Sequence, residues 1–157
     1  MITFSLTEDI DLVKSILHSP NNWPYQYQDD HFYEFDLIKT YPPYIKTIKV
    51  EEDSTPIGIF ILIPLFNDQA EVHLALLPAA YGKTINIGKE ALDWIWRHLP
   101  FEKLIGPVLK DNKLVIRMVE AIGFTYEGLV EKAWLKDTVK QDLVLYGINR
   151  PNNTNGV

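Results

Sequence analysis

Glu71 and His73 are the two residues whose types and spacing best suit proton transfer. They lie two positions apart in residues 70–77, an alternating segment that predicts a β-strand, so both side chains point to the same face. A carboxylate and an imidazole on one face could hold a water molecule that accepts a proton. We expect the apolar neighbours of Glu71 to raise the pKa of its carboxyl into a range suited to base catalysis. The alternative for His73 is a histidine that only packs on a half-buried strand.

The turn after this strand is a candidate anion site. Gly82-Lys83-Thr84 opens a helix predicted over residues 83–99, as in a phosphate-binding loop. The leading glycine of such a loop is replaced by Leu77, and no apolar strand ends in an Asp that could bind magnesium, which argues against a nucleoside triphosphatase. The backbone N–H groups from about Tyr81 to Ile85 still lie at the positive end of the helix dipole, where a pyrophosphate could bind.

Periodicity predicts the elements that must position these residues. A capping-box pattern, Ser5-Leu6-Thr7-Glu8, followed by apolar residues at helical spacing predicts a first helix over residues 7–18. Predicted strands lie at residues 45–51, 57–66, 70–77, 103–108, 126–135 and 141–148, and further helices at residues 83–99 and 112–122. We therefore expect a single domain over residues 1–148 and a polar, flexible tail over residues 149–157.

Aromatic side chains are dense between residues 23 and 44, where a short helix is predicted near residues 30–39. They are interpreted either as packing under a long connection or as the walls of a ligand pocket, and both interpretations stay open.

The composition excludes several classes of protein. The 157 residues, 46% hydrophobic and 23% charged, are typical of one globular domain. Cysteine is absent and the four histidines lack metal-ligand spacing, so neither a disulfide scaffold nor a metal site is expected. The net charge of −6, without a basic cluster, argues against a nucleic-acid partner. No apolar run approaches the roughly 20 residues of a membrane span, and no signal-like N-terminus is found, so we expect a cytoplasmic protein with no membrane partner.

A longer pattern links the second half of the chain. Residues 112–124 read Asn-Lys-Leu-Val-Ile-Arg-Met-Val-Glu-Ala-Ile-Gly-Phe and are followed by Glu127-Gly128, while Asp142 opens the last predicted strand. Ala70-Glu71-Val72 and the turn from Pro78 to Lys83 lie upstream. These motifs and the order of elements resemble the GNAT superfamily of acyl-CoA-dependent N-acyltransferases, and within it the ribosomal-protein-alanine-acetylating branch.

The resemblance, which covers residues 57–148, implies an α/β (α+β) fold. That fold has a mixed, mostly antiparallel central sheet of about six to seven strands flanked by about four helices. It also implies that acetyl-CoA is the co-substrate and that its pyrophosphate binds at the turn. The residues at that turn are Tyr81, Gly82, Lys83, Thr84, Ile85 and Asn86. Thr84 and Asn86 stand where the superfamily has small residues, so their side chains weaken the expected binding.

The same resemblance implies roles around the reacting atoms. The backbone N–H of Leu76 or Leu77 would meet the oxyanion. Tyr126 is the candidate acid for the leaving thiolate, because Val115 stands where the branch has Ser. Asn112 either contacts the pantetheine arm or caps the helix that it begins.

Two functions are consistent with these residues. The first is an N-acyltransferase that moves an acetyl group from acetyl-CoA to an amine, either a small molecule or a protein N-terminus. Its cleft would lie between the strands at residues 70–77 and 103–108, where Gly106-Pro107 would end their pairing. The second is a GNAT-like binding or structural module without catalysis, such as a phage-encoded assembly or virion protein, with a protein partner or a homo-oligomer.

Overall fold

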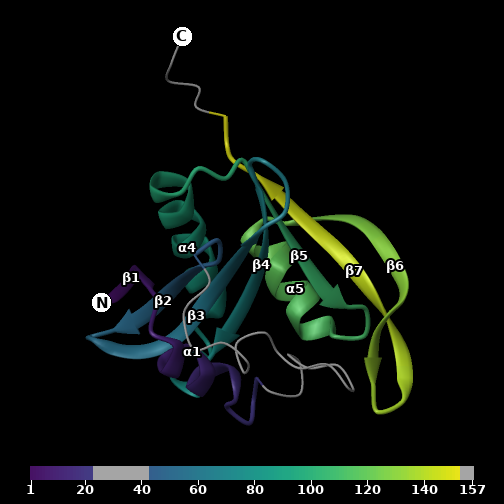
Figure 1. The fold of residues 1–157 in the computed structure, drawn as a ribbon, viewed down its shortest axis with the longest axis horizontal. Helices are drawn as coiled ribbons and strands as arrows, with labels where there is room; N and C mark the ends of the chain where they lie inside the picture. Colours follow the sequence, from purple (N-terminus) through teal and green to yellow (C-terminus); the bar gives the residue numbers. More distant parts are fainter. Residues whose placement is uncertain (23–42, 153–157) are drawn as a thin grey trace.

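The computed structural model describes residues 1–22 and 43–152, and this part of the chain forms one seven-stranded mixed sheet (Figure 1). The strands lie in the order β1-β2-β3-β4-β5-β7-β6, and every neighbouring pair is antiparallel except β4 and β5. The strands are β1 (Ile2–Thr7), β2 (Lys46–Glu52), β3 (Thr55–Pro64), β4 (Gln69–Leu76), β5 (Lys103–Leu109), β6 (Thr125–Lys136) and β7 (Val139–Asn149). The predicted fold class is thereby confirmed.

Three α-helices flank the sheet in the described ranges: α1 (Ile10–Leu17), α4 (Thr84–His98) and α5 (Lys113–Ile122). A single 3₁₀ turn, η1 (Pro78–Ala80), precedes α4. The helix predicted near residues 30–39 and most of the aromatic segment lie outside the described residues. No helix among those described is long and apolar enough to cross a membrane.

The sheet separates two hydrophobic clusters. Helices α4 and α5 pack on one face, where even-numbered residues of β4, β5 and β7 such as Ala70, Leu104 and Val144 are buried. Helix α1 covers the other face over β3 and β4, where Val13 and Ile16 meet Ile59, Ile61 and Ala75. Because side chains alternate along a strand, the odd-numbered residues of β4, including Glu71 and His73, belong to the α1 face.

The N-terminal prediction of a helix over residues 7–18 is wrong at its start. Residues 2–7 form the edge strand β1, paired from Ile2↔Glu52 to Thr7↔Thr47, because Ile2 and Phe4 alternate inward with exposed Thr3. The capping role falls to Asp9, whose Oδ1 accepts from the Leu12 N–H at 3.0 Å. Helix α1 therefore begins at Ile10.

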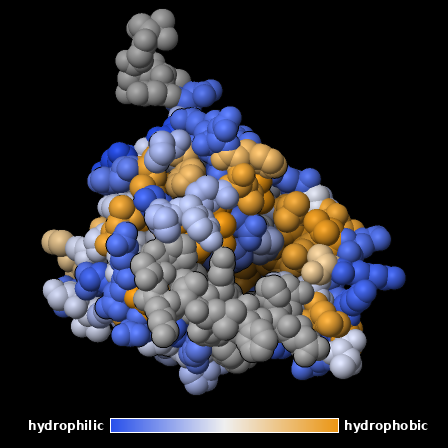
Figure 2. Space-filling view, viewed as in Figure 1, coloured by the Kyte–Doolittle hydropathy of each residue, from blue (hydrophilic) through white to orange (hydrophobic). Residues whose placement is uncertain are grey.

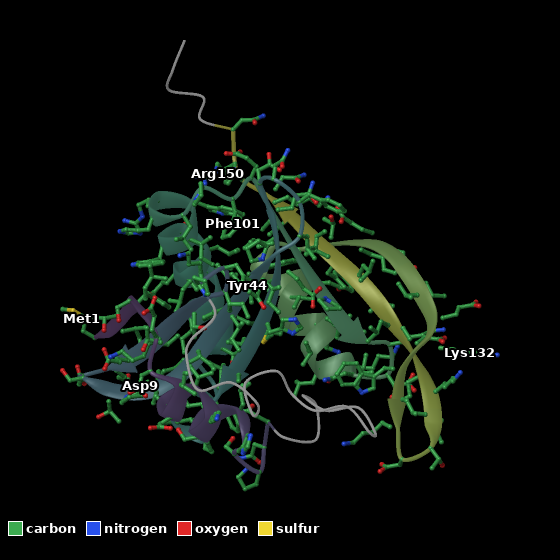
Figure 3. The ribbon with its side chains drawn as sticks, in the orientation of Figure 1. Met1, Asp9, Tyr44, Phe101, Lys132 and Arg150 are labelled. Atoms are coloured by element: carbon green, nitrogen blue, oxygen red, sulfur yellow. The ribbon has the colours of Figure 1, made fainter. Side chains whose placement is uncertain are left out.

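The predicted flexible tail also begins too early. Asn149 is the last residue of β7, opposite Lys103, and the Arg150 guanidinium is held at the C-terminal end of α4. It donates to Leu99 O at 2.7 Å, to Phe101 O at 2.7 and 3.0 Å, and to Trp96 O (Figure 3). These carbonyls have no partner within the helix, so Arg150 closes the helix end and anchors the end of β7.

Helices α4 and α5 meet at Gly88, a glycine on the buried face of α4. A Cβ at Gly88 would lie 2.3 Å from Ile122 Cδ1, so the missing side chain makes the space into which Ile122 packs. Gly123 ends α5 with φ +122°, and its N–H donates to the carbonyls of Val119 and Glu120. The position of α5 behind the sheet is thus fixed by two glycines.

Candidate functional site

The parallel pairing of β4 and β5 stops half-way along both strands. Pairing runs from Gln69↔Lys103 to Glu71↔Ile105 and ends there, while Gly106 and Pro107 continue to pair with β7. Beyond this point no backbone pairing joins the two strands, and Figure 1 shows them diverging with α5 behind them; we call the unpaired stretch between the two backbones the opening. The sequence predicted a cleft between these strands at Gly106-Pro107, and the divergence begins one residue before it.

The backbone of β4 directs alternate N–H groups into this opening. At one end the Gln69 carbonyl accepts from the Leu65 N–H at 2.9 Å, and at the other the Leu77 N–H donates to Ile57 O at 2.8 Å. The backbone N–H and C=O groups of odd-numbered β4 residues therefore form hydrogen bonds with β3. Those of the even-numbered residues, including the N–H groups of Leu74 and Leu76, point toward β5. Of the two predicted oxyanion donors, the Leu77 N–H is already hydrogen-bonded to Ile57 O, whereas the Leu76 N–H faces the opening.

Glu71 and His73 are joined by a hydrogen bond on the α1 face of β4. His73 Nε2 lies 2.5 Å from Glu71 Oε1, and both side chains are about one-third exposed or less. The hydrogen bond from His73 lowers the pKa of the Glu71 carboxyl, and this effect outweighs the burial that would raise it. The predicted raised pKa of Glu71 is therefore wrong, because the neighbouring imidazole and not the apolar surroundings dominates.

The N-terminus of α4 offers free backbone donors. Lys83 is the N-cap and no side chain caps the helix, while the first helical bond runs from the Ile87 N–H to Lys83 O at 2.9 Å. The N–H groups of Thr84, Ile85 and Asn86 thus have no acceptor within the helix. Gly82, with φ +86°, has nothing within 4 Å of the position that a Cβ would take. A diphosphate can reach these donors, so the residues present fit the coenzyme group that the sequence predicts here.

The Lys83 side chain is not directed at that site. Its Nζ lies 2.5 Å from Glu52 Oε1, and its backbone N–H donates to Ala80 O at 3.1 Å. Tyr81 is half exposed, next to Gly82 at the start of this turn. The donors that remain for an anion are therefore backbone N–H groups. The Lys83 ammonium could join them only after breaking its ion pair with Glu52.

The remaining predicted residues are not brought to the Glu71–His73 pair. Asn112 Oδ1 accepts from the Val115 N–H at 3.3 Å, so Asn112 caps α5, one of its two predicted roles. Tyr126 is 58% exposed on the edge strand β6 and packs edge-to-face on Tyr146, on the face covered by α5. Two strands, β5 and β7, separate it from β4, so the predicted acid role of Tyr126 is not supported by its position.

Asn22 was missed in the sequence, where it reads as a turn residue. Its Nδ2 lies 3.0 Å from three acceptors: Ile16 O, Ser19 Oγ and Leu76 O. These hydrogen bonds connect the C-terminal end of α1 to Leu76, the last residue of β4, whose N–H faces the opening.

A second missed group is Glu127, which pairs with Lys103 at the start of β5. Glu127 Oε1 lies 2.5 Å from Lys103 Nζ, and the Glu127 carboxylate lies over Gly147, where an added Cβ would come within 2.3 Å of it. The sequence signal was the Glu127-Gly128 motif. Its ion-pair partner, Lys103, and the glycine that leaves room for the carboxylate, Gly147, are both distant from it in the sequence. No group of three or more His, Asp or Glu among the described residues is arranged to hold a metal ion.

The sequence matches no protein-family model and no curated protein, whereas solved structures resemble it over nearly the whole chain. The spermidine N-acetyltransferase of Vibrio cholerae, in a complex with CoA and spermine, aligns with a TM-score of 0.79 and 20% identity, covering 94% of this chain and 95% of that one. Its dodecameric structure in an intermediate state aligns with a TM-score of 0.76 and 23% identity, over 94% and 93% of the two chains. The chain has the GNAT fold.

The GNAT fold accounts for the arrangement of the site. The diverging β4 and β5, the uncapped start of α4 and the Glu71–His73 pair lie on consecutive parts of one strand–turn–helix unit. An elongated ligand with a diphosphate at one end can lie along β4 and bring its other end near His73. The chemistry available there is proton transfer beside a backbone N–H donor.

Proposed function

We propose that the protein is an N-acetyltransferase that moves an acetyl group from acetyl-CoA to an amine. The observation that carries the proposal is the opening between β4 and β5, with the Leu76 N–H facing it and the Glu71–His73 pair beside it. The solved relative bound to CoA and spermine has the same fold, which supports the proposal by analogy.

Two parts of this chain would hold the coenzyme. Free N–H groups at Thr84, Ile85 and Asn86 would bind the pyrophosphate, with Gly82 leaving room for it. The unpaired backbone of β4 would lie along the amide-bearing arm, in place of the strand partner that β5 does not supply there. When bound, the coenzyme supplies the acetyl group as a thioester that an amine can attack.

His73 would take the proton of the attacking amine. Glu71, whose pKa is lowered, stays ionised at neutral pH and accepts from His73 Nε2–H, which leaves Nδ1 as the unprotonated nitrogen. The carboxylate thus fixes the tautomer and stabilises the imidazolium as it forms, as the aspartate does in a serine-protease triad. Glu71 is a positioning residue in this scheme and His73 is the base.

The Leu76 N–H would stabilise the negative charge that develops on the carbonyl oxygen. Asn22 fixes this donor, because its side chain holds the Leu76 carbonyl at 3.0 Å. No described side chain is assigned as the acid for the leaving thiolate, so solvent would supply that proton. This replaces the role first predicted for Tyr126.

Calorimetric titration with acetyl-CoA tests the first half of the proposal. Binding in the micromolar range is expected, and saturation at 100 times the dissociation constant should stabilise the fold by about 2.7 kcal/mol in a thermal-shift series. Release of free thiol on addition of a primary amine tests the second half. Absence of binding at millimolar coenzyme would overturn the proposal.

The alternative of a module without catalysis has weaker support. Divergence of β4 from β5 leaves backbone donors unpaired inside the sheet, which a purely structural domain has no reason to keep. The cytoplasmic location, the protein partner or second copy and the phage origin considered from the sequence stay predictions. Size measurement of the purified protein, alone and with acetyl-CoA, addresses the homo-oligomer.

A further inference from the structure

The α1 face of the sheet is only partly covered by α1. Helix α1 contacts β3 and β4, whereas β5, β7 and β6 continue the same face beyond the opening. Odd-numbered residues of β5 and β7 point to this face, because their even-numbered neighbours are buried under α4 and α5. Figure 2 shows hydrophobic surface to the right of its centre, beside a hollow, over this part of the sheet.

This surface is an apolar strip that starts at the Glu71–His73 pair. Register places Glu71 beside Ile105, then Pro107 beside Leu145, then Leu109 beside Leu143. Trp134 follows on β6, opposite Gln141. Four residues of strand separate the Glu71 row from the Leu109 row, which is about 13 Å at 3.3 Å per residue. The members of the strip are Ile105, Pro107, Leu109, Leu143, Leu145 and Trp134, all half-buried.

The described residues of β5 and β7 carry little charge on this face. Among residues 103–109 of β5 and 141–147 of β7 that point to it, Lys103 is the one charged residue, and Glu127 pairs with it at 2.5 Å. Glu71, beside Ile105 at the start of the strip, accepts from His73 at 2.5 Å, and no ion pair among the described residues gives it a lysine or arginine partner. The Glu71 carboxylate can balance one ammonium group. A second ammonium group further along β5 and β7 would face the apolar side chains that these two strands present there.

We propose that the acceptor is a primary monoamine with an apolar or aromatic body, and not a polyamine. This inference rests on the proposed acetyltransferase function and names its acceptor class. The amine nitrogen would lie beside His73, and the body would lie on Pro107, Leu145 and Leu143 and be removed from water there. The solved relative with bound spermine shares the fold, but among the described residues that β5 and β7 direct to this face there is no carboxylate for further ammonium groups.

Matched amines test the inference directly. Thiol release is measured with n-hexylamine against 1,6-diaminohexane, which differ by one terminal ammonium, and with phenethylamine against spermidine. We expect kcat/KM to be at least tenfold higher for the monoamine of each pair. Equal values, or a preference for the diamine or spermidine, would overturn the inference while leaving the acetyltransferase function in place.

Two truncations on β7 provide a test variant and its matched control. Leu145→Ala removes part of the strip and should lower kcat/KM for phenethylamine at least fivefold, with acetyl-CoA affinity unchanged. Val144→Ala truncates the neighbouring residue, which is buried on the α4 and α5 face, and should leave the amine preference unchanged. Coenzyme binding without turnover of any amine also overturns the inference, whereas loss of coenzyme binding in the parent protein overturns the proposed function itself.

Discussion

His73 Nε2 lies 2.5 Å from Glu71 Oε1, and the two residues are neighbours on one face of β4. The sequence suggests that Glu71 and His73 act together on a water molecule, whereas the geometry suggests a base and a residue that positions it. If His73 is the base and Glu71 its positioning residue, His73→Ala should lower kcat by about 10²- to 10⁴-fold. Glu71→Gln keeps the shape and should lower kcat less, by about 10- to 100-fold, with little change in acetyl-CoA affinity. Steady-state kinetics with far-UV circular dichroism checks both, and equal effects of the two variants would contradict this division.

The carboxyl of Glu71 should titrate below its ordinary pKa in the native protein. Because the folded pKa is lowered, the pair stabilises the fold above about pH 4.5, and this stabilisation is lost as pH falls through the folded pKa. His73→Leu removes the hydrogen bond and leaves burial as the main effect, so the pKa of Glu71 should then rise. Carboxyl-carbon NMR titration of both proteins measures the direction, and no difference between them would refute the assigned cause.

Gly82 should be sensitive to any side chain that resists its backbone conformation. Its φ of +86° is unfavourable for β-branched residues, while the space around it is open, so the effect comes from the backbone. Gly82→Val should raise the dissociation constant of acetyl-CoA about tenfold, which corresponds to roughly 1.4 kcal/mol. Gly82→Asn, which tolerates positive φ, should have a smaller effect in the same calorimetric titration. Equal losses for both variants would point to a steric cause instead.

Arg150 should matter for stability and not for catalysis. Its guanidinium bonds to the carbonyls of Trp96, Leu99 and Phe101 and lies 5.4 Å from the centre of the Trp96 ring. Arg150→Ala leaves these carbonyls without a partner and should destabilise the fold by about 2–3 kcal/mol, with the melting temperature falling by several degrees. Arg117→Ala, at an exposed position of α5, serves as the control for loss of charge and should change little.

The contact between Gly88 and Ile122 should show strong coupling. Gly88→Ala places a methyl group 2.3 Å from Ile122 Cδ1 and should destabilise the protein by about 1–3 kcal/mol, despite the better helix propensity of alanine. Ile122→Ala vacates that space and is itself destabilising, yet the double variant should be more stable than the sum of the two predicts. Denaturant unfolding of the four proteins measures this, and additive effects would show that the helices simply move apart.

Periodicity was enough to predict most of the fold. The strands β2 to β7 and the helices α4 and α5 lie within two residues of their predicted ranges, because each repeats its buried positions over several residues. Strand β1 was missed because its few alternating residues, Ile2 to Thr7, overlap a pattern that also suits a helix start. A local pattern cannot decide this, since the partner strand β2 lies some forty residues further along the chain.

The site was only partly predictable, because several of its contacts join residues that are distant in the sequence. That Glu71 and His73 share a face follows from strand geometry, but the sign of the pKa shift depends on side-chain rotamers that bring the two into contact. Tyr126 was chosen by sequence position, and the strand order places it at an edge of the sheet, on the opposite face. Asn22 and Glu127 act through residues distant in the sequence, Leu76 and Lys103, so no local motif identifies them.

The early end of the β4–β5 pairing gives the sheet two edges in its interior. Only three residue pairs join β1-β2-β3-β4 to β5-β7-β6, so backbone donors on both sides of the opening lack a strand partner. On an outer edge such groups invite strand addition by other chains and aggregation. Here the two unpaired edges face each other within one sheet and α5 lies behind them (Figure 1), so they do not form an outer edge to which another chain could add a strand. The protein thereby keeps reactive backbone available to a ligand while withholding it from neighbouring molecules.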